Sequence, residues 1–136
     1  MTASEKMRSL ALSRLQQAEE SLDEAQFLFD GGKSLRSVIN RVYYAMFYAI
    51  LALLIFEPFG SSKHTAVLSY FNLHFIKNGR LPKELGRAVN KAFELRQRGD
   101  YKEIVTIVPE QAEPLLSQAA EFIRAVRQFL VNSNHI

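Results

Sequence analysis

Polar side chains suited to binding an anion recur within one otherwise apolar stretch of the sequence, residues 35–56. In a helix, which turns by 100° per residue, these side chains fall within an arc of about 100°. They are Ser37, Asn40, Arg41, Tyr44 and Tyr48. A guanidinium is always charged, so in apolar surroundings it requires a partner or an opening to water. Arg41 is therefore the centre of the predicted site.

Two interpretations of Arg41 are open. In the first it is a structural arginine, bonded to a carboxylate or to the carbonyl groups at a helix end. In the second it faces a cleft or a self-association groove, where its planar guanidinium gives two parallel hydrogen bonds to a phosphate. Tyr44 and Tyr48 can then stack on a base or donate a hydroxyl.

A second group of cationic side chains lies in the segment 80–98. On a helix these side chains form one narrow stripe opposite an apolar face. They are Arg80, Lys83, Arg87, Lys91 and Arg98. The stripe is interpreted either as a solvated surface or as a salt-sensitive contact with nucleic acid. Arg96 departs from it because it points with the apolar side, where it needs a partner, and Asp100 is one candidate.

Metal and cofactor chemistry find little support in the sequence. It contains no cysteine, which excludes disulfides and thiolate metal sites. His64 and His74 are ten residues apart, so they lie on different sides of a helix and lack the spacing of a metal-binding pair. No glycine-rich phosphate loop is present. We therefore predict neither a metal nor a cofactor.

The elements that must position these residues are helices. Apolar positions recur every three or four residues, and glycine or proline interrupts the pattern between segments. The predicted helices span residues 4–29, 35–56, 63–77, 82–99 and 109–131. The short loops between them favour antiparallel neighbours, so we predict an all-α, up-and-down bundle of about five helices, forming one domain over residues 1–136.

Composition narrows the classes of protein to consider. The net charge is +3 and the pI is about 9.3, which suits an anionic partner without requiring one. Residues 1–20 lack the apolar core of a signal peptide. The longest uncharged run, residues 42–56, has 15 residues, fewer than the roughly 20 that cross a bilayer. We therefore expect a cytoplasmic protein with a buried core helix and no membrane association.

The segment from Asn40 to Ala49 resembles the signature helix of HEPN domains (higher eukaryotes and prokaryotes nucleotide-binding). Its sequence is Asn-Arg-Val-Tyr-Tyr-Ala-Met-Phe-Tyr-Ala. The resemblance extends to Ser62-Lys63-His64, to Phe71, and to the segment from Arg96 through Asp100-Tyr101. Together with the amphipathic first and last helices it covers nearly the whole chain.

The resemblance implies a helical bundle that dimerises through the motif-bearing helices. Many HEPN members are metal-independent RNases, often toxins paired with a small nucleotidyltransferase antitoxin. Their motif is an arginine followed, after four to six residues, by a histidine. Arg41 matches the arginine, but Met46, Phe47 and Tyr48 stand where the histidine is expected.

Tyr48, at the six-residue position, is a weak substitute because tyrosine has an unperturbed pKa near 10 and is a poor base near neutral pH. General acid–base catalysis typically contributes about 10²–10⁴ in rate, so the loss of histidine affects cleavage more than binding. One hypothesis is a toxin-like RNase, with Arg41 and Tyr48 as the catalytic pair. Its alternative is a non-catalytic homodimeric module that binds nucleotide or RNA, or acts as an adaptor. In both, the predicted binding residues are Asn40, Arg41, Tyr44, Tyr48 and Arg96.

A third hypothesis is a purely structural helical adaptor. It predicts that Arg41 is closed off in an internal salt bridge, with no accessible cleft beside it.

Overall fold

The structure is a computed structural model that describes residues 1–99 and 106–136, and within these residues all regular elements are helices. The elements are α1 (Ala3–Asp30), α2 (Leu35–Leu54), α3 (His64–Phe71), η1 (Asn72–Lys77), α4 (Lys83–Gly99) and α5 (Pro109–Asn132). The all-α prediction is confirmed, and the predicted helix ends lie within two residues of those observed. The third segment divides, because η1 continues α3 as a π-helix.

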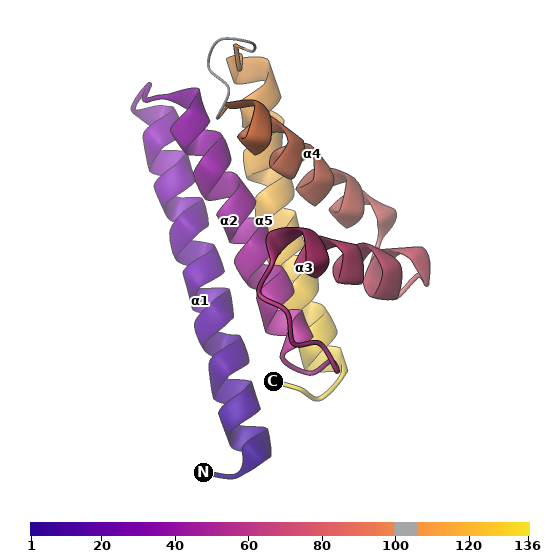
Figure 1. Cartoon of the computed structure of the whole chain (residues 1–136). Helices are drawn as coiled ribbons and strands as arrows, with labels where there is room; N and C mark the ends of the chain where they lie inside the picture. The colour runs from indigo at the N-terminus through magenta and orange to yellow at the C-terminus, as the bar shows by residue number, and fades with distance from the viewer. Residues whose placement is uncertain (100–105) are drawn as a thin grey trace.

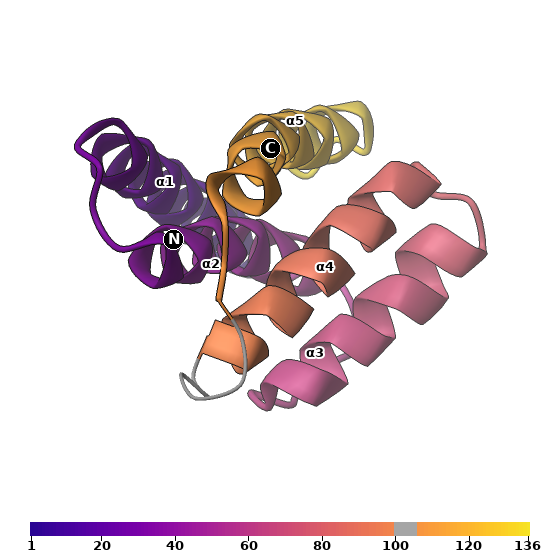
Figure 2. The ribbon, with the colours of Figure 1, turned by 90° about the horizontal axis from the view of Figure 1, so that it is seen from above.

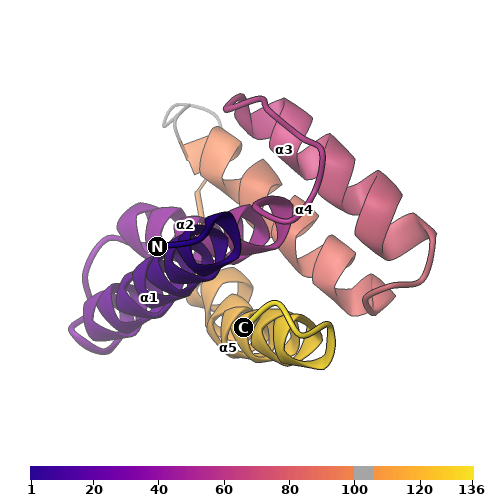
Figure 3. The same ribbon diagram turned by 90° about the horizontal axis from the view of Figure 1, so that it is seen from below.

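Three long helices and one helical hairpin make up the molecule. In Figure 1, α1 runs antiparallel to α2, and α5 runs in the same direction as α2. Figures 2 and 3 show α3 and α4 side by side, crossing obliquely on one side of α2. This hairpin carries the chain back to the end of the bundle where α2 began. As a result, α2 contacts α1, α5 and α4.

The core is centred on α2, in which 12 of the 20 residues are buried. The contact of α2 with α1 is the most extensive between two helices in the described part of the chain, and both helices bury small residues. Ala45, Ala49 and Ala52 are completely buried, as are Ala11 and Ala18 of α1. Such side chains allow helix axes to approach closely.

By length and composition alone α2 qualifies as a membrane-spanning helix, but 67% of its apolar window is buried inside the bundle. Burial of that kind is typical of a core helix, which agrees with the interpretation from the sequence.

Local signals in the sequence explain where the helices begin and end. Thr2 caps α1 by accepting a hydrogen bond from the Glu5 amide, and Ser34 caps α2 in the same way. Gly32, between α1 and α2, has φ = 65°, and Gly79, before α4, has φ = 80°. These left-handed conformations favour glycine because side chains with a Cβ are strained there.

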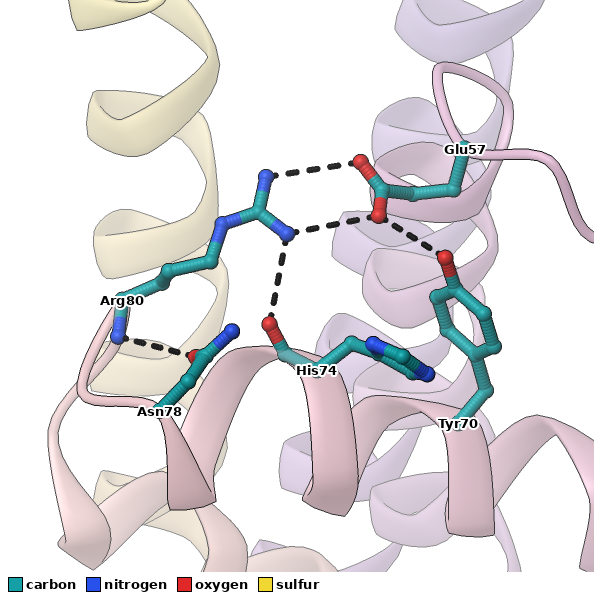
Figure 4. A network of polar contacts seen from close by, with 5 residues as sticks. All are labelled: Glu57, Tyr70, His74, Asn78 and Arg80. Atoms are coloured by element: carbon teal, nitrogen blue, oxygen red, sulfur yellow. Dashed lines mark hydrogen bonds and ion pairs between the residues drawn. The ribbon is translucent and has the colours of Figure 1, made fainter.

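A polar network fixes the α3–η1–α4 hairpin to the end of α2 (Figure 4). Both oxygens of Glu57 accept hydrogen bonds from the Arg80 guanidinium, at 3.3 and 3.4 Å, and Oε1 also accepts one from Tyr70 Oη at 2.9 Å. Arg80 donates a further hydrogen bond to the carbonyl oxygen of His74 at 3.2 Å. The guanidinium also lies 4.1 Å from the centroid of the Phe75 ring.

We expect Glu57→Ala to lower the free energy of unfolding by about 1–2 kcal/mol, because Tyr70 and Arg80 both lose their acceptor. Urea denaturation followed by circular dichroism measures the change. Glu121→Ala is the matched control, since Glu121 pairs with Arg124 on an exposed face of α5, where loss of an ion pair costs little. Equal stability of the two variants would contradict this role of the network.

Candidate functional site

The Tyr44 ring is the point at which the predicted site residues meet. The Cζ atom of Arg41 lies 5.1 Å from its centroid and that of Arg96 lies 5.2 Å away. Arg96 Nη2 also donates a hydrogen bond to Tyr44 Oη at 3.4 Å. The Tyr48 ring packs against Tyr44 with 5.8 Å between centroids. The structure thus brings two guanidiniums, from α2 and α4, to one aromatic side chain.

Arg41 is held by its neighbour Asn40 and not by an acid. Its Nε and Nη2 donate to Asn40 Oδ1 at 3.2 and 2.9 Å. Nη1 makes no hydrogen bond, and no carboxylate pairs with the guanidinium, within residues 1–99 and 106–136. The side chain is only partly buried. As far as the described residues show, a pair of N–H donors on Arg41 therefore has no acceptor within the protein.

An open pocket of about 410 Å³ lies beside this guanidinium, and we call it the arginine pocket. Its lining residues come from the end of α1, the first half of α2 and α4. They are Leu28, Arg36, Ser37, Asn40, Arg41 and Arg96. Of the lining residues that the structure describes, Arg41 and Arg96 each bring a guanidinium to the Tyr44 ring and none carries a carboxylate, an arrangement that suits an anion.

Arg96 points inward from α4, as its position on the apolar side predicts. Its Cζ lies 5.2 Å from the centroid of the Tyr43 ring, which is completely buried. Arg96 Nε is buried and has no hydrogen-bond partner in the part of the chain that the structure describes. The predicted partner Asp100, like Tyr101, falls outside the described residues. The Tyr43 and Tyr44 rings thus face a guanidinium whose Nε has no acceptor among the described residues.

His64 joins the same group of side chains from the first residue of α3. Its Nδ1 is 2.9 Å from Tyr43 Oη, and its ring stacks on Phe47 with 4.2 Å between centroids. It also meets the Tyr44 ring edge-on at 5.8 Å. Burial lowers the pKa of His64 below its usual value of 6.5, and the nearby Arg96 charge lowers it further. Burial raises the pKa of Tyr43 well above 10, so its hydroxyl stays protonated.

A second open pocket, of about 510 Å³, adjoins His64, and we call it the histidine pocket. Its lining residues are Tyr44, Lys63, His64, Thr65, Phe93, Arg96 and Gln97. It has an aromatic wall from Tyr44 and Phe93 and a cationic rim from Lys63 and Arg96. Arg96 lines both pockets and connects them, whereas Tyr44 is among the described lining residues of the histidine pocket and not of the arginine pocket.

His64 is not among the predicted site residues. Its spacing from His74 excludes a metal-binding pair within one helix, and no other pattern within that helix selects it. In the structure His74 packs on Tyr70 instead. The one signal was the segment Ser62-Lys63-His64, which resembles the HEPN pattern. The position of His64 beside α2 depends on how α3 crosses α2. The spacing of residues within one helix does not predict that crossing.

Three of the five cations in the stripe that runs from Arg80 along α4 form ion pairs with acids of the described residues. Arg80 pairs with Glu57, while Lys91 and Arg98 both pair with Glu94, at 3.9 and 3.4 Å. Surface pairs of this kind are typical of a solvated helix face. This observation favours the first interpretation of the stripe and leaves the two pockets as the stronger candidates for anion binding.

Known proteins are similar to this chain over most of its length. The family profile described as HEPN domain matches residues 11–129. A UPF0332 protein of Thermotoga maritima is 40% identical over 113 residues, which cover 83% of this chain and 85% of that protein. Two proteins of Methanocaldococcus jannaschii are also similar. Putative toxin MJ0142 is 33% identical (88% of this chain, 81% of that protein), and Putative toxin MJ0605 is 34% identical (83% of each).

Proposed function

The chain belongs to the HEPN domain family, and on this premise we propose that it binds RNA or nucleotide phosphates and acts as the toxin-like component of a two-protein module. The observation that carries the binding proposal is the arginine pocket, which the Arg41 and Arg96 guanidiniums both line and in which no carboxylate occurs among the described lining residues. An arginine closed off by an internal salt bridge would have favoured the purely structural hypothesis.

Phosphate is the anion that best suits this arrangement. A guanidinium has a planar set of donors that matches the oxygens of a phosphate, and Nη1 of Arg41 is not engaged by the described residues. Single-stranded RNA or a nucleotide adds a base, for which the Tyr44 ring and Phe93 offer aromatic surfaces.

The proposal of a toxin-like role is supported by the names of the two Methanocaldococcus jannaschii relatives. We further propose two partners: a second copy of the chain and a small nucleotidyltransferase that acts as antitoxin. The α2 face that carries Arg41, Tyr44 and Tyr48 is only partly covered within the monomer, which leaves surface for such contacts. Co-purification of the two gene products, followed by light scattering, tests both partners.

We expect Arg41→Ala to weaken the binding of single-stranded RNA by about 10- to 100-fold, because a charge-assisted pair of hydrogen bonds to phosphate is lost. Fluorescence anisotropy with an end-labelled RNA measures the affinity. The slope of log affinity against log salt concentration should fall by about 0.7 for each phosphate contact removed.

The matched control for Arg41 is Arg124→Ala, which makes the same charge change on the exposed face of α5. We expect it to bind RNA nearly as well as the wild-type protein. Equal losses in the two variants would mean that only net charge matters. Absence of RNA and nucleotide binding in the wild-type protein would overturn the proposed function.

A further inference from the structure

We propose that the histidine pocket is the subsite for the base of the bound RNA or nucleotide, and that it accepts guanine and rejects adenine. The group that makes this choice is the Nε2–H of His64. The inference rests on the proposed function, because it requires a nucleotide phosphate to bind beside Arg41 and Arg96. It goes further by naming the base and the residue that selects it.

The hydrogen bond between Tyr43 and His64 fixes the position of the proton on the imidazole. Tyr43 is completely buried, and burial raises the pKa of its hydroxyl, which therefore keeps its proton. Within the described residues this hydroxyl has one hydrogen-bond partner, His64 Nδ1, at 2.9 Å. A buried hydroxyl proton without an acceptor is costly, so Tyr43 donates and Nδ1 accepts. The proton of the neutral imidazole is then on Nε2.

The Nε2–H group of His64 is a donor that the described part of the protein does not use. It has no acceptor there, and Nε2 is not among the buried polar atoms that lack a partner, so a ligand can reach it. The Phe47 ring, stacked at 4.2 Å between centroids, fixes the plane of the imidazole. A protonated imidazole also carries a proton on Nε2. His64 therefore offers a donor to the histidine pocket in either charge state.

The guanidinium of Arg96 supplies further donors to the same pocket. Its Nη1 has no acceptor among the described residues and is not one of their buried atoms. Lys63 adds an ammonium group, and no described lining residue carries a carboxylate. Thr65 and Gln97 can each donate or accept, so they adapt to the ligand. A ligand that meets both His64 and Arg96 must therefore offer acceptors.

The aromatic wall of the histidine pocket indicates that this ligand is a base. Tyr44 and Phe93 both line the pocket and are partly exposed, and nucleic-acid bases stack on such rings. The volume of about 510 Å³ is within the range of small-ligand sites. Because Arg96 lines both pockets, a base here is adjacent to a phosphate in the arginine pocket. One nucleotide can therefore occupy the two pockets together.

Guanine is the base whose edge best matches a pair of donors. Its O6 and N7 atoms are neighbouring acceptors, whereas adenine has the N6 amino group, itself a donor, in place of O6. In the histidine pocket that amino group would face the His64 Nε2–H or the Arg96 guanidinium, donor against donor. On the corresponding edge uracil has one acceptor and cytosine has a donor. The pocket therefore favours guanine, and the sharpest contrast is with adenine, which has the same size.

The test measures the dissociation constants of GMP, AMP and IMP by isothermal titration calorimetry. The three nucleotides share their ribose and phosphate, so the ratio of two constants reports only on the base. We expect the wild-type protein to bind GMP about 10- to 100-fold more tightly than AMP. IMP keeps O6 and N7 but lacks the 2-amino group of guanine, and it should bind as tightly as GMP.

His64→Phe removes the donor and keeps a planar ring that can stack on Phe47. We expect the preference for GMP over AMP to disappear in this variant, through weaker binding of GMP, while the affinity for AMP changes little. His74→Phe is the matched control. It makes the same substitution on η1, where the ring packs on Tyr70, and His74 is not among the described lining residues of the histidine pocket. This control should keep the wild-type preference.

A second measurement uses only the wild-type protein, so it does not depend on whether His64→Phe folds. In ¹⁵N-labelled protein at neutral pH, two-bond proton–nitrogen NMR correlations report which imidazole nitrogen carries the proton. We expect Nε2 of His64 to be protonated and Nδ1 to be the acceptor. A proton on Nδ1 alone would overturn the inference, because Nε2 would then offer an acceptor to the pocket.

The binding results separate this inference from the proposed function. Equal affinity of the wild-type protein for GMP and AMP overturns the inference and leaves the proposed function standing, as does binding of RNA without binding of any of the three nucleotides. IMP that binds as weakly as AMP overturns it, because recognition would then depend on the 2-amino group. A preference for GMP that persists in His64→Phe also overturns it. Failure to bind RNA and all three nucleotides overturns both.

Discussion

Arg96→Met should make the protein more stable and, at the same time, a weaker binder of RNA. We expect the free energy of unfolding to rise by about 1 kcal/mol, because a buried polar group without a partner is replaced by an apolar side chain of similar length. We expect RNA affinity to fall by about 10- to 100-fold, because one of two guanidiniums at the phosphate position is removed.

The expected gain in stability rests on Arg96 Nε, which is buried without a hydrogen-bond partner in the described residues. The contacts of the guanidinium with the Tyr43 and Tyr44 rings, at 5.2 Å each, offset part of that cost. A thioether packs well on the same aromatic faces and has no polar hydrogen to satisfy. Arg96 thus lowers the free energy of unfolding while it supplies a charge to the pocket, a combination that is common for binding and catalytic groups.

Arg98→Met is the matched control, since Arg98 lies on the same helix but pairs with Glu94 at the surface. It should change neither stability nor RNA binding appreciably. Denaturant unfolding and fluorescence anisotropy on the same preparations measure both quantities. A destabilised Arg96→Met variant would show that the cation–π contacts outweigh the unsatisfied Nε. Unchanged affinity would exclude Arg96 from the site.

The fold was predictable because the sequence of each helix contains both its apolar pattern and the residues that mark its ends. Apolar positions repeat with the period of a helix, and residues such as Gly32, Gly79 and Pro109 mark the ends. The division of the third segment into α3 and η1 was not predicted. A π-helical turn differs from an α-helix by one residue in its hydrogen-bond ladder, and composition does not report that change.

Only the site residues that belong to one helix could be grouped from the sequence. Asn40, Arg41, Tyr44 and Tyr48 share one face of α2, and helical spacing is enough to group them. The inward direction of Arg96 also followed from spacing, but its contact with Tyr44 depends on where α4 crosses α2. His64 depends entirely on such a crossing.

The contacts that hold α3 in place therefore decide whether the histidine pocket forms. In the described part of the chain, α3 has few contacts with α2. Aromatic residues provide much of its attachment to the rest of the bundle. Phe71 packs on Phe122 of α5 at 5.5 Å, and His64 stacks on Phe47. In η1, which continues α3, Phe75 packs on Phe129 at 5.7 Å. Phe71 and Phe122 are both completely buried.

We expect Phe71→Ala to lower the free energy of unfolding by about 3–5 kcal/mol, because it leaves a cavity between α3 and α5. The site should respond as well, since the same residue anchors the helix that begins with His64. With α3 less tightly packed, His64 becomes more hydrated and lies farther from Arg96. Its lowered pKa should then return towards the ordinary value of about 6.5.

Proton NMR measures this effect directly, because the chain has 3 histidines and His64→Gln identifies the His64 resonance. In the wild-type protein the His64 signal should titrate below that of an unperturbed histidine, and in Phe71→Ala it should move upwards. Phe27→Ala is the control, since that ring is 76% exposed on α1 and should alter neither stability nor the titration. A Phe71→Ala variant that loses stability while the His64 titration stays unchanged would mean that α3 is held at His64 by its own contacts. Packing at the far end of the helix would then have no part in forming the site.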